Sequence, residues 1–152
     1  RLREIAGSVS LASDFIVGFP GETEEDFLQT VDLVNRAGYK NSFIFKYSPR
    51  EGTSAAGLPD DVSIADKKRR NNTLLDFQKA SSLEHNRSFV SRVATVLVDG
   101  PSKKGPLGLA GRTEGEEIVI FDGPESLIGS FVDVRITRAT AITLFGQWQS
   151  EG

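Results

Sequence analysis

The first half of the chain shows apolar runs of two different periods, separated by turns that contain glycine. Residues 15–17 are apolar and two of them are β-branched, which favours a buried strand. Thr23 then precedes an acidic turn and apolar residues at helical spacing, and Gly38 follows the last of them. Residues 41–47 are again typical of a strand. The pattern predicts a β–α–β unit with two parallel strands.

Such a unit leaves part of its sheet uncovered. Parallel strands are usually buried on both faces, and one helix cannot cover both. The unit therefore needs more sheet than this chain supplies. We expect its open strand edge to be covered by self-association, by residues 1–13, or by a helix that begins at Ser63. Residues 48–62, rich in Pro, Gly, Ser and Asp, indicate a loop before that helix.

A second helix is predicted over residues 63–88. Ser63 and Asp66 have the spacing of a capping box. The apolar side would come from Leu74, Leu75 and Phe77. Residues 67–70 form a basic run, and we interpret it as a solvated helix face, with a binding patch as the alternative.

The second half changes to short strands separated by Gly, Pro and Asp turns. The predicted strands are residues 93–98, 107–112, 117–121, 131–139 and 143–148. Five short strands in about sixty residues predict a small five-stranded antiparallel β-barrel of the oligonucleotide-binding kind. The fold class is therefore α/β plus all-β. The expected parts are an α/β part at 1–62, a linker helix at 63–90 and the barrel at 91–152.

Composition narrows the class of protein. The chain has 152 residues, a net charge of −3 and neither cysteine nor methionine. It has no apolar run of the roughly 18 residues that span a membrane, and no signal-peptide pattern. We expect a cytoplasmic protein without a membrane partner. The missing methionine indicates either a processed start or the tail of a longer enzyme, and the uncovered sheet favours the tail.

The residues show no catalytic set and no metal-ligand spacing. His85 is the only histidine, and we interpret it as a surface or packing residue. The chain alone is therefore predicted to catalyse nothing. The turns after the two parallel strands are still notable, because α/β proteins place their ligands at the carboxyl ends of strands.

The predicted barrel carries cations that could hold phosphates. Because the chain is net acidic, any positive surface must be local. Arg135 and Arg138 are an odd number of residues apart, so in a regular strand they face opposite sides. They can belong to one patch only if the strand has a bulge.

Four segments together resemble a known family. They are DFIVGFPGETEEDF at residues 14–27, FKYSPREGTSA at 45–55, residues 96–113 with GPSKK and GRT, and residues 128–139. In this order and spacing they resemble the radical S-adenosylmethionine methylthiotransferases, with a TRAM domain at the end. The tRNA-modifying, MiaB-like branch is the most similar. The branch that modifies a ribosomal protein aspartate is the alternative.

The resemblance implies a longer enzyme that uses S-adenosylmethionine and two 4Fe-4S clusters. In the tRNA branch it adds a methylthio group to carbon 2 of an isopentenyl-adenosine beside the anticodon. This chain has no cysteine, so it cannot hold the clusters. It would be the C-terminal part of the radical S-adenosylmethionine barrel, which is TIM-like but partial, followed by the TRAM barrel. Its partners would be the tRNA anticodon stem-loop and the missing N-terminal domains.

The resemblance also assigns sites. The cofactor-binding residues would be Gly18, Phe19, Pro20 and Gly21. The substrate-binding residues would be Lys46, Tyr47, Ser48 and Arg50. The RNA-binding residues would be Lys103, Lys104, Arg112 and Thr113. No catalytic or metal residue is expected in this chain. A different class of function, a stand-alone RNA-binding module, is the remaining alternative.

Overall fold

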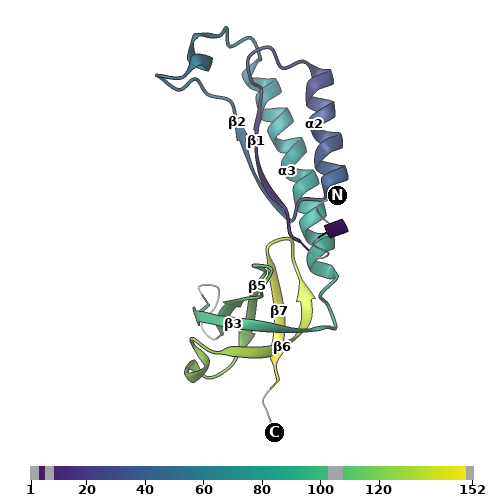
Figure 1. The fold of residues 1–152 in the computed structure, drawn as a ribbon, viewed down its shortest axis with the longest axis vertical. Coiled ribbons are helices and arrows are strands. Elements are labelled where there is room, and N and C mark those ends of the chain that lie inside the picture. The colour runs from purple at the N-terminus through teal and green to yellow at the C-terminus, as the bar shows by residue number, and fades with distance from the viewer. Residues whose placement is uncertain (1–3, 6–8, 103–107, 150–152) are drawn as a thin grey trace. The chain divides into compact units, whose positions relative to one another are not determined.

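The computed structural model describes residues 4–5, 9–102 and 108–149, which form two compact units (Figure 1). We call residues 10–81 the α/β unit; the barrel unit comprises residues 82–152 together with residues 1–9. The main elements are β1 (Ala12–Val17), α2 (Glu24–Ala37), β2 (Asn41–Lys46), α3 (Ile64–Arg87), β3 (Val93–Pro101), β4 (Leu109–Arg112), β5 (Ile118–Asp122), β6 (Phe131–Ala139) and β7 (Thr143–Trp148). Two short 3-10 helices are η1 (Ser54–Gly57) and η2 (Glu125–Leu127).

The α/β unit confirms the predicted β–α–β arrangement. Strands β1 and β2 pair in parallel, and both helices lie on one side of this sheet (Figure 1). Four residues form the core between them: Val17, Phe27, Val34 and Leu74. The sheet has two strands within the described part of the chain, so these residues do not close an α/β barrel.

The face of the sheet that points away from the helices is apolar and exposed. Ile16, Phe43 and Phe45 are 58%, 63% and 53% exposed, and the two Phe rings stack with centroids 6.4 Å apart. Alternation along the strands puts these side chains opposite Phe15 and Ile44, which pack against the helix side. Self-association, one of the predicted ways to cover the open strand edge, finds no support in the structure. The face is uncovered by the described residues.

Both helix starts carry the caps predicted from the sequence. The Asp26 amide donates to Thr23 Oγ1 (3.1 Å), and the Thr23 amide donates to Asp26 Oδ2 (2.9 Å). At the start of α3, the Asp66 amide donates to Ser63 Oγ (3.0 Å). Gly38 ends α2 in the left-handed conformation, with φ 56°, as predicted.

The buried side of α3 differs from the predicted one. Leu75 and Phe77 are 44% and 38% exposed, so they do not form the apolar side of the helix. The buried residues of this stretch recur every three or four positions: Lys67, Arg70, Leu74 and Gln78. The interpretation of the basic run as a solvated face was therefore wrong for Lys67 and Arg70, which are 6% and 5% exposed. Their spacing from Leu74 places them on the side that faces the rest of the unit.

The barrel unit closes in the order β3–β4–β5–β7–β6, with β3 also paired to β6. The predicted antiparallel barrel was wrong in one respect, since β5 and β7 are parallel. A closed ring with an odd number of strands cannot have every neighbour antiparallel, because directions must alternate around the ring. The core consists of inward residues from all five strands: Val96, Val98, Leu109, Val119, Phe121, Val132, Val134, Ile136 and Leu144.

We predict that replacing Thr23 with Ala raises the pKa of Asp26. Hydrogen bonds from Thr23, first through its hydroxyl and then through its amide, hold the pKa of the Asp26 carboxyl below its usual value. The cap therefore contributes stability above the unfolded-state pKa of Asp26, and loses it as the pH falls through the lower folded-state pKa. An NMR pH titration of the carboxyl measures the shift. Ser63→Ala is the matched control and should move Asp66 alone; an unmoved Asp26 in Thr23→Ala contradicts the argument.

We also predict that Gly111→Ala destabilises the barrel by about 2–3 kcal/mol. An added Cβ would meet the Leu97 backbone oxygen and would lie 2.6 Å from Val96 Cγ1, inside the closed barrel. Urea unfolding followed by Trp148 fluorescence reports on this unit, because Trp148 is the only tryptophan and packs against the barrel core. Gly57→Ala is the control, since a Cβ there meets nothing within 4 Å. Equal midpoints for the two variants would refute the steric explanation.

Candidate functional site

A pocket of about 710 Å³ lies at the carboxyl ends of β1 and β2. Its lining combines apolar side chains with two cations, one carboxylate and three hydroxyls. The lining residues are Ile16, Phe19, Lys46, Tyr47, Ser48, Pro49, Arg50, Glu51, Thr53 and Ala55. An apolar pocket with a few polar groups suits a small ligand that has a flat part and a charged part.

Two aromatic rings connect the loops on either side of this pocket. The rings of Phe19 and Tyr47 meet edge to face, with centroids 5.1 Å apart. Tyr47 is 9% exposed, and its hydroxyl donates to the Ala55 carbonyl at 2.8 Å. Phe19 is 41% exposed. Tyr47 therefore fixes the second loop, and Phe19 presents ring surface to the pocket.

The glycine turn after β1 is held by carboxylates of the chain itself. Gly18 and Gly21 have φ of 73° and 82°, conformations that favour glycine. The Gly18 amide donates to the Glu22 carboxylate, and the Gly21 amide donates to Asp61 Oδ1 at 2.8 Å. These two amides are therefore engaged within the protein and shape the turn.

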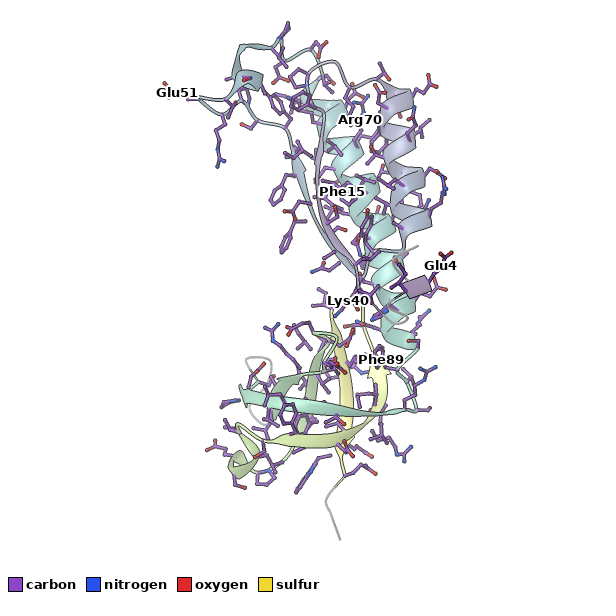
Figure 2. All side chains as sticks on the ribbon, in the orientation of Figure 1. Glu4, Phe15, Lys40, Glu51, Arg70 and Phe89 are labelled. Atoms are coloured by element: carbon purple, nitrogen blue, oxygen red, sulfur yellow. The ribbon has the colours of Figure 1, made fainter. Side chains whose placement is uncertain are left out.

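Two buried cations from α3 support the turn and the second loop, and we call Lys67 and Arg70 the cation clamp. Arg70 projects from α3 (Figure 2). Its Nη1 lies 2.7 Å from Glu22 Oε2 and 3.0 Å from the Glu22 carbonyl oxygen. Lys67 Nζ pairs with Asp60 Oδ1 at 2.5 Å and lies 5.1 Å from the centre of the Tyr47 ring. The sequence interpretation missed this clamp. The sequence did contain a sign of the clamp: Lys67, Arg70 and Leu74 follow one another at intervals of three and four residues, which puts them on one side of a helix.

The structure brings together part of the predicted site. Phe19 and the four predicted substrate-binding residues, Lys46, Tyr47, Ser48 and Arg50, line the same pocket. The other three predicted cofactor residues do not line it. Gly18 is buried against the Lys67 side chain, and Pro20 and Gly21 lie elsewhere in the turn.

The predicted RNA-binding residues belong to the barrel unit. Lys103 and Lys104 lie outside the described residues. Arg112 pairs with Glu116 (2.8 Å) and Asp99 (3.3 Å), and these carboxylates, Glu116 foremost, raise the pKa of its guanidinium. The charge of Arg112 is therefore largely balanced by its neighbours.

Thr113 and His85 meet at one buried carboxylate in the barrel unit. The Thr113 hydroxyl donates to Glu117, and His85 Nε2 lies 3.0 Å from Glu117 Oε1. The side chain of Glu117 is 3% exposed. His85 also packs edge-on against Phe89, with ring centroids 5.5 Å apart. Both side chains are therefore engaged in contacts inside the barrel unit, and His85 is a packing residue, one of the two roles predicted for it.

Residues 4–5, 9–102 and 108–149 contain no cluster of side chains that could form a metal-binding site. Within these ranges no three His, Cys, Asp or Glu side chains gather where one ion could bind them. No helix in the same ranges has the length and apolar character needed to cross a bilayer.

We predict that Arg70→Met costs about 3–5 kcal/mol, because it leaves the buried Glu22 carboxylate unpaired. The side chains of Arg70 and Glu22 are 6% and 11% exposed. Arg69→Met is the matched control: Arg69 pairs with Glu24, but both side chains are about half exposed, so the expected cost is about 0–1 kcal/mol. Urea unfolding by circular dichroism, with hydrogen exchange at the glycine turn, measures both. Equal losses of unfolding free energy in the two variants would show that Arg70 and Glu22 do not form a buried ion pair in solution.

Comparison with known proteins agrees with the resemblance. Residues 87–148 match the TRAM domain family. Over 151 residues, 99% of this chain, it is 44% identical to tRNA-2-methylthio-N(6)-dimethylallyladenosine synthase of Desulfitobacterium hafniense. Proteins with the same name in Pseudoalteromonas atlantica and Moorella thermoacetica are each 47% identical over 146 residues, 96% of this chain.

The chain covers 34%, 31% and 33% of these three relatives, about a third of their length. The match nevertheless extends through both units of the structure. The resemblance predicted from the sequence is confirmed: residues 87–148 match the TRAM domain family, and nearly the whole chain is similar to part of the methylthiotransferases named above.

Proposed function

We propose that this chain is the C-terminal part of a tRNA-2-methylthio-N6-dimethylallyladenosine synthase. The parent enzyme would add a methylthio group to carbon 2 of isopentenyl-adenosine beside the anticodon, in the cytoplasm. The observation that carries the proposal is 44–47% identity to synthases of this name over at least 96% of the chain. By itself the chain would make contacts to the cofactor and the tRNA without catalysing the reaction.

The exposed sheet face supports a larger barrel in the parent enzyme. Ile16, Phe43 and Phe45 are more than half exposed on a parallel sheet, a class of sheet that is normally covered on both faces. Strands β1 and β2 would be the last strands of a radical S-adenosylmethionine barrel, within an α/β part at 1–62. A linker helix at 63–90 and the TRAM barrel at 91–152 would follow.

The pocket beside β1 and β2 fits one side of a nucleoside-containing cofactor. Its volume, about 710 Å³, is within the usual range for small ligands, and Phe19 offers ring surface against which a base can pack. S-adenosylmethionine, reduced by a 4Fe-4S cluster, would supply the radical that starts the reaction. This chain has no cysteine, so the ligands of both clusters would come from the N-terminal domains. Gly18, Pro20 and Gly21 would shape the turn that presents Phe19.

The substrate would approach the charged rim of the same pocket. Lys46, Ser48 and Arg50 are exposed there, and a cation at this rim can bind a phosphate of the target nucleotide. Tyr47 would act by positioning, because its hydroxyl is already bonded to Ala55. Lys103, Lys104, Arg112 and Thr113 would be the RNA-facing residues of the TRAM domain.

The test is a chimera in which this chain replaces the matching third of the Moorella relative, expressed in cells that lack the enzyme. We predict that the methylthio nucleoside returns to tRNA, as measured by mass spectrometry of nucleosides. Arg50→Gln in the chimera should lower its level about tenfold or more, through loss of a charged hydrogen bond. Arg36→Gln is the control with the same charge change, because Arg36 is exposed on α2 and pairs with Asp32.

A soluble chimera with loaded clusters that yields no methylthio nucleoside would overturn the proposal. A methylthio group on a ribosomal protein aspartate in the same cells would assign the chain to the alternative branch. Equal activity of the Arg50→Gln and Arg36→Gln chimeras would remove Arg50 from the substrate site.

A further inference from the structure

A β-bulge in β6 puts two arginines on the same face of the barrel. Arg135 pairs with Gln147 of β7 and Arg138 pairs with Phe145, with a register shift between Ile136 and Arg138. Thr137 is therefore the extra residue of the bulge. Partners two positions apart on β7 point to the same side, so the bulge meets the condition under which Arg135 and Arg138 can form one patch.

Arg138 is stacked on an aromatic ring on this outer face. Its guanidinium carbon lies 3.7 Å from the centre of the Phe145 ring. Phe145 points outward, because its neighbour Leu144 is fully buried in the core, and Ile120 of β5 lies beside it. The stack leaves Arg138 exposed, so one side of the planar guanidinium is held and the charge stays accessible.

These arginines differ from Arg112 in their surroundings. Among the described residues neither Arg135 nor Arg138 has an ion pair, whereas Arg112 has two. The carboxylate closest along the same face of β6 is Asp133, which accepts a hydrogen bond from Thr95 at 2.8 Å. The positive end of the strand is therefore the end that holds Arg135 and Arg138.

A charged guanidinium on an aromatic ring suits nucleic acid in two ways. Arginine binds phosphate through two hydrogen bonds in a fixed plane, and a stacked guanidinium offers a flat surface for an unpaired base. An acidic protein surface would use the charge but would not need the flat stack. The combination of the two favours RNA.

We propose that Arg135, Arg138 and Phe145 form an RNA-binding surface, which we call the β6–β7 face. The arginines bind backbone phosphates, and the Arg138–Phe145 stack carries an unpaired base of the anticodon loop. The proposal rests on the proposed function, in which this chain contacts tRNA. It moves the main contact of the barrel from Arg112 on β4, whose charge is balanced, to the β6–β7 face.

The experiment is a titration of the 152-residue chain into a fluorescent anticodon stem-loop, followed by anisotropy at several salt concentrations. We expect Arg135→Gln and Arg138→Gln each to weaken binding at low salt about tenfold. Each should also reduce the slope of log K against log salt by about 0.7–0.9, the contribution of one phosphate contact. Arg36→Gln removes the same charge from an exposed position on α2 and should leave the slope near that of the wild type. Arg112→Gln is measured beside it as the test of the other candidate contact of the barrel.

Two further variants test charge and stacking separately. Arg138→Lys keeps the charge but lacks the planar group, so it should keep the salt slope and lose affinity for the loop relative to a duplex without unpaired bases. Asp133→Asn removes a negative charge from the same face and should tighten binding. Trp148 fluorescence in urea checks that each variant is folded; if Arg138→Gln is not, Arg138→Lys and Asp133→Asn decide the question.

The outcomes separate this proposal from the one it rests on. If the wild-type chain does not bind the stem-loop at low salt, RNA contact by this chain fails, and the β6–β7 face fails with it. If the wild type binds and the Arg135 and Arg138 variants bind equally well, the β6–β7 face is overturned while RNA contact stands. Loss of affinity in Arg112→Gln alone would return the contact to Arg112.

Discussion

The α/β unit depends on two ion pairs that buried cations of α3 make with the glycine turn and the following loop. Arg70 meets Glu22 where both side chains are nearly buried, whereas Lys67 is buried and meets Asp60, whose side chain is 37% exposed. Removing charges from water is costly, and their attraction compensates only when geometry and hydrogen bonding are good. The pairs are therefore best understood as fixing one arrangement of the turn and the following loop.

The two units differ in how completely they pair their strands and cover their apolar side chains. The barrel unit closes its sheet, so every strand has two neighbours and the apolar residues of all five strands meet inside. The α/β unit has a two-stranded sheet with helices on one face and three large apolar residues exposed on the other. Its small core and its buried charges hold the pocket in place. A full covering of the sheet requires residues that the described chain does not provide.

The sequence was sufficient where the deciding signals are local. Caps such as Thr23 and Ser63, the helix end at Gly38 and the five barrel strands follow from residues near one another in the chain. The sequence was insufficient where contacts between distant segments determine which side chains are buried and which strands pair. Leu75 and Phe77 are apolar and still lie outside, because the tertiary position of α3 turns Lys67 and Arg70 inward. The parallel β5–β7 pair follows from closure of the ring, which no single segment encodes.

The candidate site shows the same division between local and distant causes. The pocket residues of two loops could be named because each follows a strand, and parallel strands end at one edge of the sheet. Whether a given cation is available to bind a ligand could not be predicted from its position in the sequence. Arg112 stands in a recognisable GRT segment, yet Asp99 of β3 and Glu116 of the β4–β5 connection balance its charge. Arg135 and Arg138 are in no such motif, yet one inserted residue, Thr137, aligns them on one face. In a net acidic chain, what a cation can bind depends on which carboxylates the fold leaves beside it, and that is set by strand pairing across the barrel.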